Sequence, residues 1–168
     1  MTAPLTTERL ILRRPIPADW PVYRDFMMSE RASYFSSSGD LGATWKAFAA
    51  ELGHWQMYDA GLWAVTFRDS DTIIGLIGPW HPPHWPEKEI GWMMLSVDVE
   101  GKGFATEAAR ASLTHAFDVL GWTTAVSYID PANARSIRLA EKLGAVLDKA
   151  ATSPMPGTLV YRHERAAA

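Results

Sequence analysis

The stretch "VDVEGKGFATEAARASLTHAF", residues 97–117, most constrains what this chain can fold into. It runs from a β-like segment through Gly101 and Gly103 into a long alanine-rich helix pattern. The first turn of a helix has backbone N–H groups without internal partners, and the aligned peptide dipoles add about half a positive charge there. Because glycine has no β-carbon, the chain can turn tightly and a bulky anion can approach these amides. The stretch therefore predicts an anion site at a strand-to-helix junction, with Lys102 adding charge from outside.

Hydrophobic periodicity predicts strands and helices on both sides of this junction. Strands alternate with helices in the second half of the chain, whereas the first half contains a hairpin pattern, so we expect an α/β fold with a mixed sheet covered by helices on both faces. In chain order the other predicted elements are a strand at 8–15, a helix from about 18, a helix at 44–55 with Thr44 as N-cap, a hairpin at 62–68 and 71–80, strands at 89–95 and 123–129, a helix at 133–144 between Asn133 as N-cap and Gly144 as its left-handed stop, and strands at 145–148 and 158–164.

Length and composition narrow the class of protein. The 168 residues fit one domain, 1–168, and 48% hydrophobic and 21% charged residues are ordinary globular values. There is no apolar run of bilayer length, no signal-peptide pattern at the start and no cysteine. The net charge of −3 comes without a basic stripe. We therefore expect a cytoplasmic protein whose partners include no nucleic acid and no membrane.

Three phosphate-binding patterns compete for the glycine turn. A Walker loop, GxxxxGK[ST], does not match. A dinucleotide fingerprint, GxGxxG, has Thr106 where its last glycine should stand. The third pattern, [Q/R]xxGx[G/A], fits at Gly103 and Ala105 and departs only at Glu100.

The third pattern belongs to the GCN5-related N-acetyltransferases (GNAT). The chain resembles this superfamily from Thr7 to Glu164, and within it the RimJ/RimL-like branch of ribosomal-protein N-terminal acetyltransferases. Four blocks carry the resemblance in order: "TERLILRRP", "EIGWMM", "EGKGFATEAARA" and "DPANARSIRLAEKLGA". The resemblance implies a sheet of six or seven strands that splays between the fourth and fifth, with acetyl-coenzyme A (acetyl-CoA) held in the splay. It also implies acetyl transfer to a primary amine, either a protein N-terminal α-amine or a small molecule. Family members are often dimers, so a homodimer is one expectation.

Carried over residue by residue, the resemblance assigns the coenzyme's contacts. The pantetheine arm is expected along Leu95, Ser96 and Val97, where an unpaired backbone N–H near Leu95 would serve as oxyanion donor. Asn133 and Ser136 match positions that face the pantetheine and the sulfur. The pyrophosphate is expected on the amides of Gly101, Lys102, Gly103, Phe104, Ala105 and Thr106.

The departure at Glu100 affects the affinity for the coenzyme. A carboxylate beside a pyrophosphate should repel it unless the side chain points away or pairs with a neighbour such as Lys102. The identity of the coenzyme is less affected, because backbone amides form most of the expected site.

Amine attack on a thioester needs a neutral amine, an oxyanion donor and a proton for the leaving thiolate. Glu89, at the start of "EIGW", is the candidate general base, with Glu87 as second choice on the same face. Many relatives carry a tyrosine as acid, but Ala140 occupies that position here. Ser136 is the substitute candidate, and Tyr128 and Tyr161 are further options.

The segment "WHPPHW", Trp80 to Trp85, has two interpretations. Its aromatic residues could form an acceptor wall, or it could be a proline-stiffened loop with tryptophans packed on the sheet. His81 and His84 alone supply two ligands, so we expect no metal. His54, His115 and His163 fall in helix or strand patterns and are interpreted as structural.

The sequence is compatible with two classes of function. The preferred one is an acetyl-CoA-dependent N-acetyltransferase that works by direct attack in a ternary complex, without a covalent enzyme intermediate, because the chain has no cysteine nucleophile. The alternative is a non-catalytic acyl-CoA binding or sensing module of the same fold.

Overall fold

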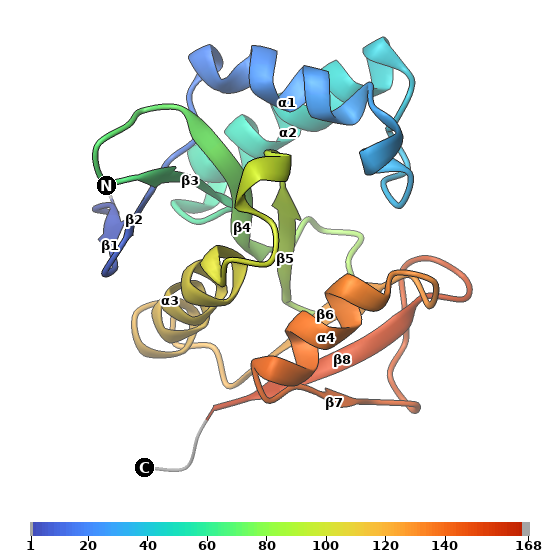
Figure 1. Cartoon of the computed structure of the whole chain (residues 1–168). Coiled ribbons are helices and arrows are strands. Elements are labelled where there is room, and N and C mark those ends of the chain that lie inside the picture. The colour runs from blue at the N-terminus through green and yellow to red at the C-terminus, as the bar shows by residue number, and fades with distance from the viewer. Residues whose placement is uncertain (1, 166–168) are drawn as a thin grey trace.

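A mixed sheet runs through the whole molecule (Figure 1). The structure is a computed structural model that describes residues 2–165. Neighbouring strands follow the order β1-β2-β3-β4-β5-β6-β8-β7, and every pair is antiparallel except the parallel pair β5 and β6. The strands are β1 (Leu5–Thr6), β2 (Leu10–Arg13), β3 (Trp63–Phe67), β4 (Ile73–Trp80), β5 (Glu89–Met94), β6 (Thr124–Ile129), β7 (Val146–Leu147) and β8 (Leu159–Glu164).

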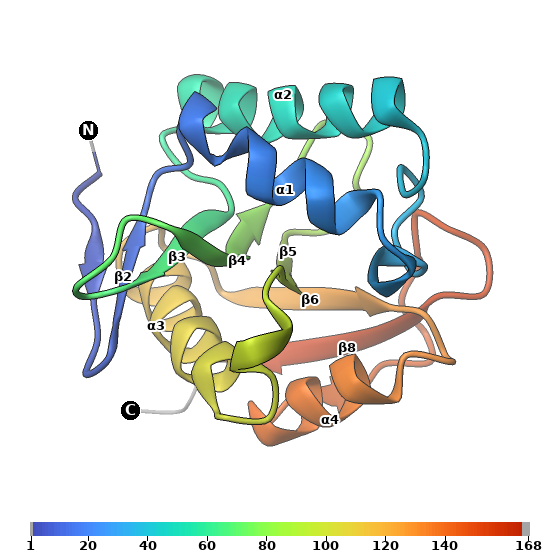
Figure 2. The same ribbon diagram turned by 45° about the horizontal axis from the view of Figure 1, so that its top comes forward.

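Helices cover both faces of this sheet, as expected (Figure 2). One face carries α1 (Trp20–Met27) and α2 (Leu41–Tyr58), and the other carries α3 (Phe104–Asp118) and α4 (Ala134–Lys142). Short 3-10 turns are η1 (Pro17–Asp19), η2 (Glu30–Ala32) and η3 (Val97–Val99). Within residues 2–165, no helix has the length and apolar character needed to cross a membrane.

The predicted topology is confirmed in its main features. The hairpin is β3 and β4, with a register shift between Val65 and Thr66. The sheet has eight strands instead of six or seven because β1 and β7, of two residues each, are counted. Without β1, the parallel pair β5 and β6 is the fourth and fifth strand, where the splay is expected.

The start of α2 differs from the prediction. The helix begins at Leu41, and its N-cap is Asp40, whose side chain accepts a hydrogen bond from the Ala43 N–H at 2.6 Å. Thr44 is fully buried in the first turns, and its hydroxyl donates to the Ser37 carbonyl at 2.9 Å. Aspartate caps a helix at least as well as threonine, so Asp40, four residues before Thr44, takes the role.

Small side chains let α3 lie close to the sheet. Ala108, Ala109, Ser112 and Ala116 are completely buried, as their helical spacing predicts. Ala108 and Ala109 pack with residues of β2 and β3, so the helix axis has little freedom to move away from the sheet. This close packing fixes the position of the helix N-terminus.

A second set of contacts anchors the start of α3. Glu107, in its first turn, accepts hydrogen bonds from the Thr7 hydroxyl at 2.6 Å and the Arg9 N–H at 2.9 Å. Arg9 also donates to the Lys102 carbonyl at 3.2 Å. The glycine turn is therefore tied to the β1–β2 segment from the side.

Enlarging a buried alanine of α3 should destabilise the fold. Ala109→Leu forces extra methylene groups into a filled interface, so the free energy of unfolding in urea should fall by about 1–3 kcal/mol. Thr114→Leu, on the exposed side of the same helix, is the control and should change it by less than about 0.5 kcal/mol. Equal effects of the two substitutions would contradict the close packing of α3.

Candidate functional site

Strands β5 and β6 pair at one position and then separate. Glu89 lies opposite Val126, and the Val126 N–H donates to the Lys88 carbonyl at 2.9 Å. One step further, the Ile90 carbonyl accepts a hydrogen bond from the Ser127 hydroxyl at 2.7 Å. The Ser127 side chain thus takes the Ile90 carbonyl, which would accept a backbone hydrogen bond if the parallel pairing of β5 and β6 continued. The two strands diverge beyond this position.

A histidine supports this serine from behind. The His163 Nε2 atom lies 2.9 Å from the Ser127 oxygen. Because the Ser127 proton is directed at the Ile90 carbonyl, the imidazole supplies the proton of this second bond. Burial lowers the pKa of His163 to about 4, so the ring is neutral at pH 7. This confirms the structural interpretation of His163.

A cavity of about 260 Å³ lies at the separation of the strands. Its walls come from α1, α2, β5, β6 and the loops next to them. Among its described lining residues there are carboxylates and no lysine, arginine or histidine. The aromatic lining includes Tyr23, Tyr34, Phe35, Trp80, Trp85 and Tyr128. The cavity therefore combines an apolar wall with carboxyl groups.

Glu89, the predicted base, faces this cavity. It lines the wall from the first position of β5 and accepts a hydrogen bond from the Trp85 indole at 2.5 Å. Burial raises the pKa of Glu89 to about 7, although the Trp85 bond opposes the shift. At neutral pH the group can therefore both accept and release a proton.

Glu51 is a second carboxyl in the cavity that the sequence analysis missed. It projects from α2 with 7% of its surface exposed, and its Oε2 atom has no hydrogen-bond partner. Burial, together with repulsion from Glu89, raises the pKa of Glu51 to about 8. The signal was available, because Glu51 follows Phe48 by three and precedes Trp55 by four, on the buried side of the predicted helix.

The alternative acids and bases lie in different surroundings. Glu87, the second choice, forms a bidentate ion pair with Arg162 at 2.8 and 2.9 Å, and this pair lowers the pKa of Glu87. Tyr161 is buried in a core cluster under α4. Tyr128 lines the cavity, and burial raises its pKa to about 12, so it keeps its proton at neutral pH.

The start of α4 brings Asn133 and Ser136 to the cavity. Asn133 is the N-cap, as predicted, and its side chain accepts a hydrogen bond from the Ser136 N–H at 3.1 Å. The Ser136 hydroxyl accepts from the Trp92 indole at 3.1 Å. That bond leaves the hydroxyl's own proton available for a further acceptor.

The glycine turn has the geometry of an anion site. Gly101 and Gly103 have positive φ angles of 73° and 82°. A β-carbon built at Gly101 would meet nothing within 4 Å, so the space beside the turn is open. The first hydrogen bond of α3 runs from the Glu107 N–H to the Gly103 carbonyl, so the amides of Phe104, Ala105 and Thr106 have no acceptor within the helix.

Glu100 pairs with two arginines instead of Lys102. Its carboxylate accepts a hydrogen bond from Arg31 at 2.6 Å and forms a close ion pair with Arg135. Both contacts lower the pKa of Glu100. Two cations therefore offset this carboxylate, and its repulsion of a pyrophosphate is weaker than the sequence suggests.

The pairing at the end of β5 excludes the N–H of Leu95 itself as the oxyanion donor expected near this residue. The Leu95 N–H donates to the Ile74 carbonyl at 2.8 Å, so this amide is not unpaired. Alternate residues of a strand direct their N–H groups to opposite sides. The Leu95 N–H points toward β4, so the N–H of Trp92, three residues earlier, points to the opposite side, toward β6. Because Trp92 lies beyond the single position where β5 and β6 pair, its N–H faces the gap between them.

The other two residues expected along the pantetheine lie at the surface of this strand end. Ser96 is the N-cap of η3, and its hydroxyl accepts a hydrogen bond from the Asp98 N–H at 3.3 Å. Val97 is 61% exposed. Arg31 donates to the Leu95 carbonyl at 2.7 Å, so its side chain crosses the same edge.

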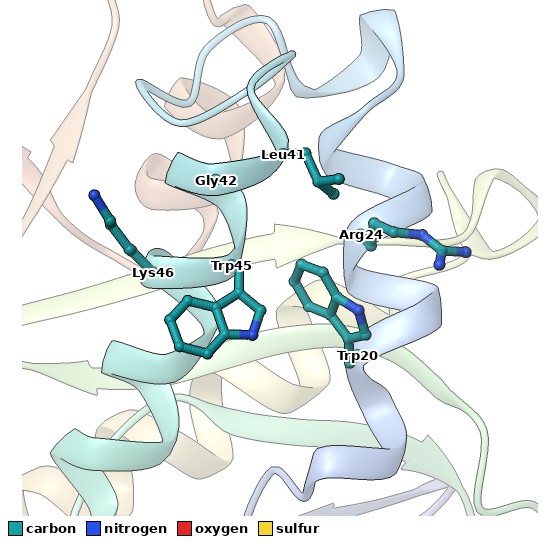
Figure 3. Close-up of a pocket in the computed structure, with 6 residues that line it drawn as sticks. All are labelled: Trp20, Arg24, Leu41, Gly42, Trp45 and Lys46. Atoms are coloured by element: carbon teal, nitrogen blue, oxygen red, sulfur yellow. The ribbon is translucent and has the colours of Figure 1, made fainter.

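A second hollow lies between α1 and α2 (Figure 3). Its volume is about 480 Å³, and the rings of Trp20 and Trp45 lie on either side of it. Arg24 and Lys46 supply its charged side chains, and its described lining has no carboxyl group. It lacks the acid–base groups found at Glu89, so the cavity between β5 and β6 is the candidate active site.

The predicted acceptor wall and metal ligands can also be placed. Trp80 and Trp85 line the cavity, whereas His81 and His84 are absent from its described lining. Across residues 2–165, no group of three or more histidine, cysteine, aspartate or glutamate side chains could hold a metal ion.

Removing the charge of Glu100 should strengthen binding of a phosphate-bearing ligand such as acetyl-CoA. Glu100→Gln releases Arg31 and Arg135 from their carboxylate, so the dissociation constant measured by calorimetry should fall roughly two- to fivefold, with a larger effect at low salt. Asp98→Asn removes a charge from the neighbouring turn and is the control. Weaker binding by Glu100→Gln would show that the carboxylate supports the site.

Comparisons with known proteins agree with this geometry. A family model described as an acetyltransferase (GNAT) domain matches residues 9–146. An acetyltransferase structure from Agrobacterium tumefaciens is 40% identical with a TM-score of 0.93, covering 98% of this chain and 96% of that chain. The Bacillus subtilis protein named "Uncharacterized N-acetyltransferase YnaD" is 26% identical over 140 residues, 83% of this chain and 81% of that protein.

A more distant structure shares the fold alone. The GNAT-family acetyltransferase from Bacillus anthracis is 21% identical with a TM-score of 0.75, covering 96% of this chain and 98% of that chain. The family match spans most of the sequence and includes the glycine turn, β5 and α4. The chain therefore belongs to the GNAT family and is an N-acetyltransferase.

Proposed function

We propose that the protein transfers the acetyl group of acetyl-CoA to a primary amine by direct attack in a ternary complex. The observation that carries this proposal is the position of Glu89, a half-buried residue whose carboxyl has a pKa raised to about 7, in a cavity at the parting of β5 and β6. The open glycine turn supports the coenzyme half of the proposal. The absence of cysteine from the sequence is consistent with a mechanism that has no covalent thioester intermediate on the enzyme.

The residues of the glycine turn and of α4 would hold the coenzyme. The amides from Gly101 to Thr106 would bind the pyrophosphate, because they combine orphan donors with the positive end of a helix of 15 residues. Asn133, Ser136 and the segment 95–97 that follows β5 would line the pantetheine arm. Acetyl-CoA supplies the activated acetyl thioester when it is bound.

Glu89 would act as general base. An alkylamine with a pKa near 10.4 is neutral in only about one molecule in a few thousand at pH 7, so it needs a proton acceptor before it can attack. Glu89 would take this proton directly or through a water. The carbon–nitrogen bond then forms as the carbon–sulfur bond breaks, and the proton lost by the attacking nitrogen balances the one gained by the sulfur.

Two other groups would complete the chemistry. The Trp92 N–H faces the gap, where it can donate to a developing oxyanion. Ser136 has a hydroxyl proton that is not used by Trp92 and can be directed at the thiolate. Removal of either donor would raise the barrier without removing the base.

Glu89→Gln should lower the turnover of alkylamines by about 10²–10⁴-fold, because proton abstraction is lost. The loss should be smaller for α-amines, with a pKa near 7.7–8.0, since about one molecule in ten is already neutral. In the wild type kcat/KM should fall as the pH drops below about 7, where Glu89 becomes protonated, and this limb should disappear in the variant.

Release of coenzyme A can be followed with a thiol reagent, since the protein itself has no cysteine. Glu87→Gln is the control, because this neighbouring carboxylate is engaged by Arg162. Equal losses for both amine classes in Glu89→Gln would remove Glu89 from the role of base. Coenzyme binding without amine-dependent release, over a broad amine panel, would support the non-catalytic module instead.

Gly103→Val should weaken acetyl-CoA binding at least roughly tenfold, because its side chain would occupy the approach to the helix amides. Gly121→Val is the matched control: Gly121 also has a positive φ, 68°, and its β-carbon would meet nothing within 4 Å, but it lies at the other end of α3. Calorimetry with both variants separates the effect of backbone strain at a positive φ from obstruction of the phosphate site by the valine side chain. Unchanged affinity in Gly103→Val would exclude the turn as the phosphate site.

A further inference from the structure

Glu51 has no structural task that explains its burial. Only 7% of the residue is exposed, and its Oε2 atom is buried without a hydrogen-bond partner. The residue lines the cavity. A buried carboxyl without a partner costs free energy, and a glutamine or leucine would avoid that cost. Such a group is expected where a ligand supplies the missing partner.

The carboxyl groups of the cavity indicate the sign of the charge on that ligand. Glu51 from α2, Glu89 from β5 and Asp130 from the loop after β6 all line it. No lysine, arginine or histidine stands among the described lining residues to balance them. Tyr23 of α1 and Tyr128 of β6, the other titratable lining groups near these carboxyls, have raised pKa values and are neutral at pH 7. Among the described lining residues no group can offset the negative charge that these carboxyls acquire when they ionise, so a cationic ligand would supply it.

The other residues of the cavity wall indicate the chemical character of the uncharged part of the ligand. Tyr23, Trp80, Trp85 and Tyr128 present aromatic rings to the cavity. Aromatic faces attract ammonium groups and also pack against apolar carbon. A cation with an apolar body therefore matches both features of the wall.

Size argues for a compact molecule. The cavity volume of about 260 Å³ lies just below the range of small-molecule sites, about 300–1,000 Å³. The Tyr34 hydroxyl donates to the Ala132 carbonyl at 3.2 Å, which joins two loops that border the cavity. An extended polypeptide would need a longer groove across this contact.

We propose that Glu51 binds the ammonium group of the acceptor, and that the acceptor is a compact primary amine with an apolar or aromatic body, bound as its cation, and not a polypeptide N-terminus. This inference rests on the proposed function. Glu51 holds the cation beside Glu89; the N–H proton passes from the ammonium to the Glu89 carboxylate, which leaves a neutral amine to attack the thioester. Glu51 is a binding residue, and Glu89 is the catalytic base.

The first test uses a cation that cannot be acetylated, in the absence of acetyl-CoA. Benzyltrimethylammonium should quench the fluorescence of the tryptophans in the wall and bind at least tenfold more tightly than benzyl alcohol, its uncharged counterpart. Glu51→Gln should weaken this binding at least tenfold. Glu30→Gln, the same change on an exposed residue of η2, should leave it unaltered. Equal binding of the cation by wild type and Glu51→Gln would overturn the proposal.

A second measurement needs no variant. Because Glu51 carries a raised pKa in the empty site, binding of a cation should ionise it and release protons near pH 7. The heat of benzyltrimethylammonium binding should therefore differ between Tris and phosphate buffers by an amount proportional to their ionisation enthalpies. Binding without proton release would count against Glu51 as the partner of the cation.

Turnover then separates substrate choice from catalysis. Phenethylamine should be acetylated with a kcat/KM at least tenfold above that of a short peptide with a free N-terminus, and Glu51→Gln should raise KM about tenfold with kcat changed less than threefold. A preference for the peptide would overturn the inference and leave acetyl transfer intact. Glu51-dependent binding of the cation with no acetylation of any amine would instead refute the proposed function.

Discussion

The separation of β5 from β6 after one paired position is the constraint on which the rest of the site depends. The strands are joined at Glu89 and Val126, and the Ser127 hydroxyl then occupies the Ile90 carbonyl that a continuing ladder would use. One divergence has two consequences. It leaves an amide of β5 facing the gap, and it opens a cavity in the middle of the sheet while strands on both sides remain fully paired.

The two sides of this gap favour ligands of opposite charge. At the glycine turn, helix amides and the arginines around Glu100 favour an anion, whereas the cavity holds the carboxyl groups of Glu51, Glu89 and Asp130 with no cation among its described lining residues. This division suits a reaction between a phosphate-bearing donor and a cationic acceptor, because each ligand is attracted to its own side. The same low-dielectric surroundings that raise the pKa of Glu89 make it a usable base near neutral pH.

Much of the fold could be predicted from the sequence, and the reasons are local. The stripe of small residues on α3, the glycine turn and the Asn133 cap are each specified by neighbouring residues, so pattern reading found them. The N-cap of α2 was misassigned because two good capping residues stand close together. The burial of Glu51 was indicated by its helical spacing, but its meeting with Glu89, the Leu95 pairing and the arginine partners of Glu100 depend on contacts between distant segments, which no local pattern specifies.

The parting of the sheet places Glu89 in surroundings that raise its pKa to about 7, which makes it a base near neutral pH. Carbon-13 NMR of the side-chain carboxyl groups, with Glu89 assigned by comparison with its glutamine variant, measures this property without any ligand or assay. We expect a titration midpoint near 7. A midpoint near 4.3, the value of an ordinary glutamate, would exclude Glu89 as a base near neutral pH.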